Sequence, residues 1–522
     1  MRLKLAIYWI RRDFRLIDNP ALTHAIEFCA KNNTALLPMF VLDKSILEHS
    51  RHPIIGKPRR QYLAKVLAQF ADQFVDFEIA LGTPKLVFSQ LQQQFDLDIF
   101  LNDDIEPYSI ARDTEIKEMI GDVHFHSFTD QLTAPSDVRA ASSGNIYSVF
   151  TPFKNAVWSD FLQAKIYAKA DIAHIKPLPS DITKIISSGL DPKNSLELLS
   201  KKLDVQQLAD QIYTKIEAPW QFEVGNTIID LDQIIGEKNN IDEWYSTENV
   251  AVAHFQAYLD SGHMDSYKQD RDDLGNDTQE TTYRGQLLRG KTSRMSPALK
   301  WGLVSARFLK ELIVQHHHID VHNPPPTRGI EGYIHYLSEL IWREFYRYIL
   351  LHHPSVLYEE FQPKYRDTID WVQNGQAQSR FLAWIKGETG YPAVDAAMHQ
   401  IASISWMHNR SRMMVASILT KNLGVDWRWG QDYFRAVLLD LDEASNNGGW
   451  QWAASVGADP KPIRIFNPYL QAENYDAQSA YQKTWLPAEY DSTKPPLIEH
   501  KKAREEALTR YHLASHSAKR DF

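Results

Sequence analysis

Short hydrophobic runs alternate with helical patterns over the first 130 residues of the chain. The runs LKLAIYWI, TALLPMFVLD, FEIALG, DLDIFLND and DVHFHSF have the length of strands, and segments such as PRRQYLAKVLAQFADQF lie between them with helical spacing. Strands that alternate with helices in this way are typical of a parallel sheet covered on both faces. We therefore expect residues 1–130 to form a doubly wound α/β domain.

The pattern changes twice farther along the chain. Between residues 131 and 235, prolines and the polar runs SSG and DPKNS interrupt it, which predicts a long connector rather than a third core. From about residue 236 the strand patterns stop and helical periodicity dominates, so we expect an all-helical domain over 236–475 and a C-terminal extension over 476–522. In YIHYLSELIWREFYRYILLHH one buried stripe recurs at three and four residues, namely Ile334, Leu337, Ile341, Phe345 and Tyr348.

Composition narrows the class of protein. With 522 residues, 43% hydrophobic and 24% charged, the chain is ordinary for globular proteins and long enough for more than one domain. The net charge is −9, so a polyanionic partner would have to be bound by a local basic patch. The single cysteine, Cys29, excludes a disulfide framework, a cysteine-ligated iron–sulfur cluster and a multi-cysteine zinc site.

No membrane or secretion signal is recognisable. No run reaches eighteen apolar residues, so no transmembrane helix is expected. The start, MRLKLAIYWIRRDFR, is basic after ten residues and has no small-residue cleavage site, which favours a first strand over a signal peptide. We expect a reducing, cytoplasmic location.

The N-terminal domain lacks the dinucleotide-binding fingerprint, because its first strand ends in RRDFRLIDNPAL without a GxGxxG turn. Two interpretations stay open. The domain is either a structural layer or the holder of a second ligand at the carboxyl edge of its sheet, where Asn102, Glu106 and Tyr108 could contact it.

In the helical part, one helix face carries three residues of different chemistry. Glu339, Trp342 and Arg343 fall at i, i+3 and i+4 and so lie together, either as a salt bridge beside a packed indole or as one wall of a site. Asn409 and Met413 share another helix face. Together these residues offer what a flipped base pair needs, which is carboxyl and amide groups for the base edges and soft apolar walls for the rings.

Further residues extend this predicted pocket. Trp452 would form the opposite stacking wall. Four arginines, Arg271, Arg343, Arg410 and Arg464, would hold nucleic-acid phosphates around its rim.

Two more segments suggest a cofactor. GKTSRMSP, residues 290–297, places hydroxyls and free backbone before a helix that can begin at Pro297, which suits an anion such as a pyrophosphate, and Tyr267 and Arg271 could close that site. In LDLDEASNNGG, acids and amides precede an NNGG turn. This spacing lacks the glutamate that ends a calcium loop, so we expect no metal and favour hydrogen bonding to a flat, redox-active ring.

Long motifs then relate the whole chain to a known family. They are RRDFRLIDNPAL, YSVFTPFKNAVW at 147–158, TSRMSPALKWG at 292–302, ELIWREFYR at 339–347, GETGYPAVDAAM at 387–398, WMHNRSRMMVASILTKNL at 406–423, and NNGGWQWAAS followed by RIFNP. With these motifs the chain resembles the photolyase/cryptochrome family, and most of all the class I bacterial cyclobutane pyrimidine dimer (CPD) photolyases.

The resemblance implies an antenna domain, a helical domain that holds FAD, and light-dependent repair of UV-damaged DNA. A flipped pyrimidine dimer would be split by an electron from photoexcited reduced FAD. It also implies a second antenna chromophore, for which a folate, a deazaflavin or a flavin are all open, and a monomer that associates with the nucleoid when bound to DNA. A (6-4) photolyase and a cryptochrome-type blue-light photoreceptor remain the alternatives.

The resemblance also implies roles for individual residues. FAD would be bound by Tyr267, Thr292, Ser293, Arg294, Met295, Ser296, Arg412, Asp440, Asp442 and Asn446. The dimer would contact Glu339, Trp342, Asn409, Met413 and Trp452. Electrons for photoreduction would pass from the surface through Trp384, Trp427 and Trp450.

The chain departs from the family pattern in four places. Residues 273–290 look like an insertion, which we expect to form a surface loop near the cofactor or the DNA. Tyr336 stands where a tryptophan is common, and the run into RIFNP is one residue short. The tail after about residue 476 is expected to extend past the fold.

Overall fold

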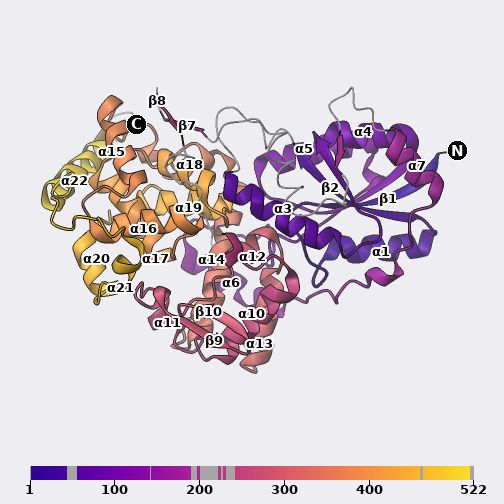
Figure 1. The fold of residues 1–522 in the computed structure, drawn as a ribbon, viewed down its shortest axis with the longest axis horizontal. Helices are drawn as coiled ribbons and strands as arrows, with labels where there is room; N and C mark the ends of the chain where they lie inside the picture. Colours follow the sequence, from indigo (N-terminus) through magenta and orange to yellow (C-terminus); the bar gives the residue numbers. More distant parts are fainter. Residues whose placement is uncertain are drawn as a thin grey trace.

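The five predicted N-terminal strands form one parallel sheet in the computed structural model (Figure 1), which describes residues 2–43, 56–141, 143–189, 197–199, 221–224, 227–230, 241–458 and 463–517. The strands are β1 (Leu3–Ile10), β2 (Ala35–Asp43), β3 (Glu78–Gly82), β4 (Phe95–Asn102) and β5 (Phe125–Phe128), in the order β5-β4-β1-β2-β3. A short strand from the expected connector, β6 (Glu197–Leu199), adds antiparallel to β3, which the sequence did not predict. The predicted α/β class of this domain is confirmed.

The side chains of β1 alternate between two hydrophobic cores. Leu5, Ile7 and Trp9 reach one face of the sheet, which is covered by α4 (Pro84–Gln94), α5 (Pro107–Ile120) and α7 (Ser180–Gly189). Tyr8 and Ile10 reach the other face, under α1 (Pro20–Asn32) and α3 (Lys57–Ala71). This second core continues into the helical domain, so the sheet and the helices are packed as one body.

The rest of the chain is mainly helical, as predicted. Its longest helix, α14 (Gly332–His352), buries the whole stripe predicted from the sequence. Around it lie α10 (Glu248–Asp260), α11 (Tyr267–Asp270), α12 (Ser296–Trp301), α13 (Ala306–His316), α15 (Asn374–Lys386), α16 (Pro392–Ile404), α17 (Asn409–Ser417), α18 (Trp427–Val437), α19 (Glu443–Ala453) and α20 (Pro468–Tyr475).

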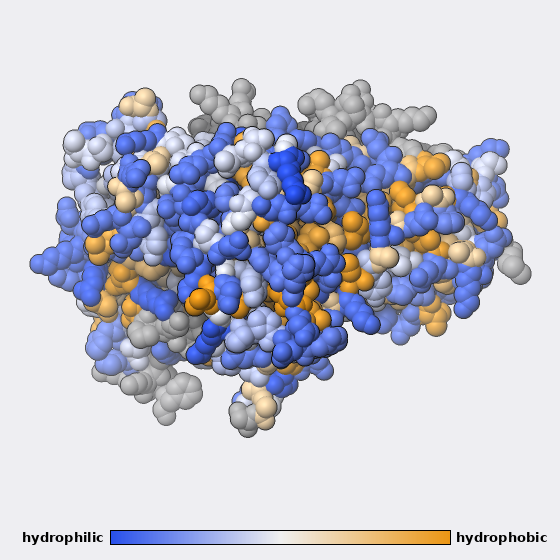
Figure 2. Space-filling view, turned by 90° about the horizontal axis from the view of Figure 1, so that it is seen from below, coloured by the Kyte–Doolittle hydropathy of each residue, from blue (hydrophilic) through white to orange (hydrophobic). Residues whose placement is uncertain are grey.

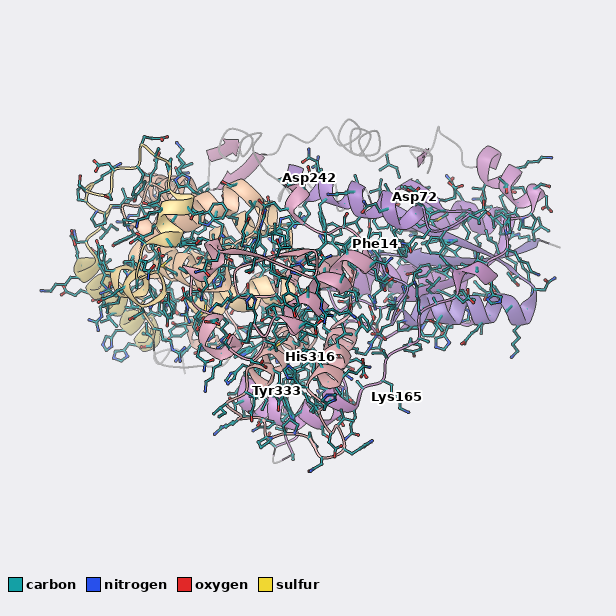
Figure 3. The ribbon with its side chains drawn as sticks, turned by 60° about the horizontal axis from the view of Figure 1, so that its bottom comes forward. Phe14, Asp72, Lys165, Asp242, His316 and Tyr333 are labelled. Carbon is teal, nitrogen blue, oxygen red and sulfur yellow. The ribbon has the colours of Figure 1, made fainter. Side chains whose placement is uncertain are left out.

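A buried cluster of charges joins the two domains. Asp130 accepts hydrogen bonds from Arg15 at 2.6 Å and from Arg307 at 2.8 Å, and Arg307 also pairs with Asp18 at 3.0 Å. Phe14, in the loop after β1, lies in the interior between the two domains. Lys165, which follows α6 in the chain, lies at the periphery (Figure 3). Because each buried charge has a partner, the loop after β1 is held rigidly against the helical domain.

Two predictions about the middle of the chain are wrong. The expected connector contributes α6 (Phe150–Gln163) to the core, and the ring of Phe150 stacks on Trp342 with centroids 3.6 Å apart. Strands also do not stop at residue 236. The insertion forms a hairpin of β9 (Glu280–Tyr283) and β10 (Gln286–Arg289). A second hairpin, of β7 (Gln221–Val224) and β8 (Thr227–Asp230), lies in the expected connector.

The segment after residue 476 does not extend past the fold, contrary to prediction. It forms α21 (Ala480–Trp485) and α22 (His500–Ser517), which supply Tyr481 and Tyr511 to the core of the helical domain. The hydroxyl of Tyr511 donates to the carbonyl of Ala454 at 2.5 Å, and the ammonium of buried Lys421 lies 3.9 Å from its ring. The tail is therefore part of the fold.

One face of the molecule shows how hydrophobic residues are distributed on the surface. The face in Figure 2 is mainly hydrophilic, with hydrophobic residues in scattered patches. Among the described residues, we find no helix of the length and apolar character needed to span a bilayer.

We predict that replacing Tyr511 by alanine lowers the free energy of unfolding by about 3–5 kcal/mol, the usual cost of deleting a fully buried aromatic ring. Leu508→Ala on the same helix is the matched control, because Leu508 is 37% exposed, and its effect should stay within about 0.5 kcal/mol. Urea denaturation followed by circular dichroism measures both. Equal effects of the two substitutions would show that α22 is not packed as described.

Candidate functional site

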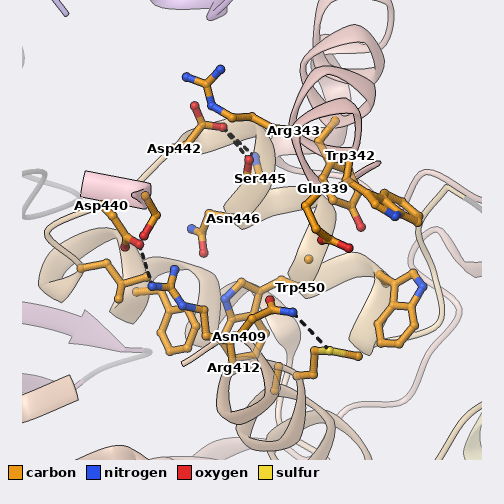
Figure 4. Close-up of a pocket in the computed structure, with 18 of the residues that line it drawn as sticks. Glu339, Trp342, Arg343, Asn409, Arg412, Asp440, Asp442, Ser445, Asn446 and Trp450 are labelled. Carbon is orange, nitrogen blue, oxygen red and sulfur yellow. Dashed lines mark hydrogen bonds and ion pairs between the residues drawn. The ribbon is translucent and has the colours of Figure 1, made fainter. Parts of the chain in front are cut away.

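A cavity of about 510 Å³, here called the central cavity, opens between α14, α17 and α19 (Figure 4). All five residues predicted to contact a flipped base pair line it, and so do five of the residues predicted to bind a cofactor. The first set comprises Glu339, Trp342, Asn409, Met413 and Trp452, and the second comprises Ser296, Arg412, Asp440, Asp442 and Asn446. Segments more than a hundred residues apart thus meet in one cavity.

Glu339 and Arg271 form an ion pair in the wall of the central cavity. About a third of each side chain is exposed, 34% for Glu339 and 33% for Arg271. Burial raises the pKa of Glu339 above its ordinary value, and Arg271 partly offsets that rise. Glu339 therefore takes up a proton at a higher pH than an ordinary glutamate does.

The four predicted phosphate-binding arginines all line the central cavity, but they are not equivalent. Arg343 is partly buried, donates to the carbonyl of Leu299 at 3.2 Å, and has a pKa lowered to about 9 by burial. Arg410 pairs with Asp272 at 2.7 Å. Arg464 covers the ring of Trp452 at 5.2 Å. Phosphate binding by these four arginines stays a prediction.

Acidic residues on the opposite side of the central cavity are each held by an arginine. Arg412 donates to Asp440 at 2.8 Å, and Arg347 donates to Asp442 at 2.6 Å, which keeps the pKa of Asp442 well below its ordinary value. Asp442 also caps α19 by accepting from the Ser445 amide at 3.0 Å. These pairings orient the carboxylates and leave little net negative charge facing the cavity.

The cavity wall holds polar atoms that suit a flat, hydrogen-bonding ring. Oδ1 of Asp440 and Nε1 of Trp450 are buried without a protein partner. The amide of Asn446 donates to the carbonyl of Gln431 at 3.1 Å and presents a neutral group beside them (Figure 4). Unpaired buried acceptors and donors are rare in native proteins, so this wall is chemically suited to a flavin.

The predicted NNGG turn is in fact part of helix α19. A Cβ on Gly448 would lie 2.0 Å from the ring of Tyr346 on α14, so this glycine permits the two helices to touch. A Cβ on Gly449 would meet nothing within 4 Å, and Gly449 lines the central cavity. One glycine serves packing and the other leaves room for a ligand.

A second space of about 190 Å³, the loop cavity, lies beside the segment 292–296. The predicted pyrophosphate-binding residues Tyr267, Thr292, Ser293, Arg294, Met295 and Ser296 all line it. It shares Arg271, Ser296, Glu339, Arg343 and Asn409 with the central cavity, so the two spaces adjoin.

Five lining residues of the loop cavity were not predicted as site residues, and three of them carry aromatic rings. Tyr336, named only as a departure from the family pattern, forms a hydrogen bond of 2.8 Å with Ser293 through its hydroxyl. Trp406 donates to Ser296 at 3.0 Å, and buried His408 caps α17. Trp406 opens the motif WMHNRSRMMVASILTKNL, which was the available signal for it.

The three predicted electron-transfer tryptophans lie in one core, but none reaches the surface. Their exposed fractions are 0% for Trp384, 0% for Trp427 and 2% for Trp450. Trp450 lines the central cavity, and its ring centroid lies 6.0 Å from that of Trp384. Their role in carrying electrons from the surface stays a prediction.

A third space, the sheet-edge cavity, has a volume of about 190 Å³ and lies at the carboxyl edge of the sheet. Glu106 lines it, but the other two predicted contacts do not: Asn102 is buried, donating to Asp13 at 2.6 Å, and Tyr108 donates to Asp43 at 2.6 Å. Trp9 also lines this cavity, although only 1% of it is exposed.

Cationic side chains line the sheet-edge cavity, and so does one residue that also lines the central cavity. Buried Arg59 has an Nη1 without a hydrogen-bond partner, and burial lowers the pKa of Lys300 to about 8. Leu441 lines both the sheet-edge cavity and the central cavity. A single stretch of chain therefore separates the two spaces.

Comparison with known proteins gives matches over most of the chain. A family model described as DNA photolyase matches residues 6–174, and one described as the FAD binding domain of DNA photolyase matches residues 336–518. The chain is 32% identical to the deoxyribodipyrimidine photo-lyase of Synechococcus, over 92% of this chain and 87% of that protein. It is 30% identical to that of Escherichia coli, over 97% and 98%.

Solved structures show the same architecture. A bacterial class III photolyase from Agrobacterium tumefaciens superposes with a TM-score of 0.74 at 26% identity, covering 99% of this chain and 98% of that one. The cryptochrome of Synechocystis shares the fold, with a TM-score of 0.73 at 21% identity over 98% of this chain and all of that one.

We predict that Gly448→Ala lowers the free energy of unfolding by about 1–3 kcal/mol, because the added methyl group must displace the Tyr346 ring. Gly449→Ala, one residue farther along the same helix, should leave stability unchanged or raise it by up to about 1 kcal/mol. Thermal melts of the cofactor-free proteins make the comparison. Loss of stability in the Gly449 variant alone would contradict the packing of α19 on α14.

Proposed function

Because this chain belongs to the photolyase/cryptochrome family, we propose that it is a light-dependent DNA repair enzyme that splits cyclobutane pyrimidine dimers. One observation carries the proposal. The central cavity brings the five predicted lesion contacts and the predicted flavin contacts to opposite walls of the same space. A flipped lesion and a flat cofactor could meet there in direct contact.

FAD is the cofactor of the proposal, and the chain matches the FAD binding domain of its family. When bound, reduced FAD supplies the photoexcited electron that splits the dimer. The segment 292–296 would hold its phosphates. Asp440, fixed by Arg412, would accept a hydrogen bond through its unpaired Oδ1, and neutral Asn446 would face the ring without repelling a negative charge on it.

The lesion side of the central cavity suits a flipped pair of bases. Trp342 is held by the stacked ring of Phe150, and Trp452 is held under Arg464, so two indoles form fixed walls. Asn409 lies 3.8 Å from the sulfur of Met413 and offers an amide to the base edges. Stacking on such walls does not depend on the neighbouring sequence, as a repair enzyme requires.

Glu339 is the residue we propose to assist dimer splitting. A protonated carboxyl can donate a hydrogen bond to a pyrimidine carbonyl and stabilise negative charge that develops there. Its raised pKa favours that protonated form, while its ion pair with Arg271 favours the ionised form. A lesion that displaces Arg271 from Glu339 would remove the ion pair that lowers the pKa of Glu339.

DNA binding is proposed to depend on a local basic patch, since the net charge of the chain is −9. Arg464 and Arg271 are the best placed of the predicted arginines. Both line the central cavity, and neither is fully buried. Phosphate contacts of this kind position the duplex without reading its sequence.

The sheet-edge cavity is the proposed site of a second, light-harvesting chromophore. Arg112 lies 4.8 Å from the ring centroid of Trp9 and Arg11 lies 5.2 Å from it, which makes an electropositive aromatic wall. A flat ring could lie against Trp9 while an anionic group pairs with Arg59. Folate, deazaflavin and flavin remain the candidate classes.

The proposed activity is tested with an oligonucleotide that carries one thymine dimer, incubated with the reduced protein in light and in the dark. Loss of the dimer only in light supports repair. No loss with intact reduced flavin would contradict the enzyme assignment and favour a cryptochrome-type photoreceptor. A parallel oligonucleotide with a (6-4) photoproduct distinguishes the two kinds of photolyase.

We predict that Glu339→Gln keeps flavin and DNA binding but lowers the repair yield per photon by about fivefold, because an amide N–H donates a weaker hydrogen bond than a protonated carboxyl and a loss of about 1 kcal/mol has this effect on a rate. The wild-type yield should fall as pH rises through the raised pKa of Glu339, because the carboxyl then loses its proton. The yield of the variant should not change over that range. A pH-dependent yield in the glutamine variant would show that another group titrates.

A further inference from the structure

The insertion contributes a buried acid beneath the loop cavity, although it was expected to be a surface loop. Asp277 lies in a short helical turn, Asn276–Thr278, and only 5% of it is exposed. Its Oδ1 accepts a hydrogen bond from Nη2 of Arg294 at 2.9 Å, and its Oδ2 accepts one from Gln400 at 2.9 Å. Arg294 therefore directs its guanidinium toward the insertion.

The hydrogen bond between Asp277 and Gln400 connects the insertion to three helices. Oε1 of Gln400, on α16, accepts from the hydroxyl of Tyr481 at 2.7 Å and from the backbone amide of His408 at 3.2 Å. Ser411, on α17, donates to the hydroxyl of Tyr481 at 3.0 Å. Asp277 thus joins the insertion, the loop 291–296, α16, α17 and α21 in one buried network.

The backbone of the loop 291–296 is oriented by its carbonyl groups. The carbonyl of Lys291 accepts from Tyr258 at 3.4 Å, that of Ser293 lies 3.1 Å from Nε2 of His254, and that of Arg294 accepts from Tyr245. In a trans peptide the following N–H points the opposite way. The amides of residues 292, 294 and 295 therefore point away from this packed side.

Arg294 also has an unusual backbone conformation. Its φ of 49° is left-handed, and the next residue, Met295, is right-handed with φ −78° and ψ −2°. Successive residues of opposite hand form a concave group of amides that binds anions. A left-handed arginine is disfavoured on its own, so its neighbours must hold it in place.

Asp277 supplies a charged contact that holds Arg294 in this conformation. The ring of Trp406 lies 4.7 Å from the guanidinium of Arg294 on another side. Gly290, at the entry to the loop, packs so closely on the insertion that a Cβ there would lie 2.9 Å from Cα of Asp277. The insertion and the loop fit together as one piece.

We propose that Asp277 is a positioning residue for the cofactor phosphates, which acts by fixing Arg294 so that the loop amides form an anion site. The inference rests on the proposed function for the identity of the cofactor as FAD. It assigns the Arg294 side chain a supporting role and leaves the backbone amides of the loop to contact the phosphates.

The test compares Asp277→Asn with wild type in titrations of cofactor-free protein with three probes, namely FAD, ADP and lumiflavin. Affinity for FAD and ADP should fall about ten- to hundredfold, the effect of weakening one hydrogen bond to a charged group. Affinity for lumiflavin, which has no phosphate, should not change. Equal losses for all three probes, or no loss, would overturn the proposal.

Further variants separate positioning from general damage to the fold. Glu280→Gln makes the same chemical change at an exposed site of the same insertion and should leave all three affinities unchanged. If Asp277 acts through Arg294, Arg294→Gln and the double variant should show the same loss as Asp277→Asn rather than a summed one. Additive losses would contradict this role of Asp277. If Asp277→Asn does not fold, the double variant still tests the proposal, because it buries no unpaired charge.

Repair is measured separately so that the two proposals can fail independently. Wild-type protein that binds FAD but leaves the thymine dimer intact in light would contradict the proposed function only. Wild-type repair together with unchanged FAD and ADP binding in Asp277→Asn would contradict the role of Asp277 only.

Discussion

The structure depends on the pairing of buried arginines with buried carboxylates where its two domains meet. Asp130 binds both Arg15 and Arg307 in the interface, and farther along the same region Asp442 is held by Arg347. A buried charge without its partner is strongly destabilising, so each pair accepts little variation in geometry. These pairs hold the sheet, α14 and α19 in fixed positions relative to one another.

Much of this arrangement could be predicted from the sequence, because it follows from short-range rules. Alternating strands and helices predicted the sheet, and spacing of three and four predicted the buried stripe of α14. Pro297 marked the start of α12, next to the loop cavity. The residues that meet in the central cavity were identified through long family motifs, since sequence spacing alone cannot bring Glu339 to Asn409.

The errors have physical causes. Helix α22 buries Ala503, Ala507 and Ala514 around Tyr511, and small residues give a weak hydrophobic pattern, so the tail looked separate from the fold. Glycines and asparagines disfavour helices, yet α19 forms through NNGG because the ring of Tyr346 fits against Gly448. The position of Asp277 depends on contacts with distant segments, which no local pattern could reveal.

One feature of the central cavity limits how this protein could change. Leu441 lines both the central cavity and the sheet-edge cavity, and its neighbour Asp442 caps α19. A mutation at this leucine would therefore alter the surroundings of both proposed chromophores at once. The colour of light collected and the electron chemistry that uses it cannot be tuned independently at this position, either by natural selection or by an engineer.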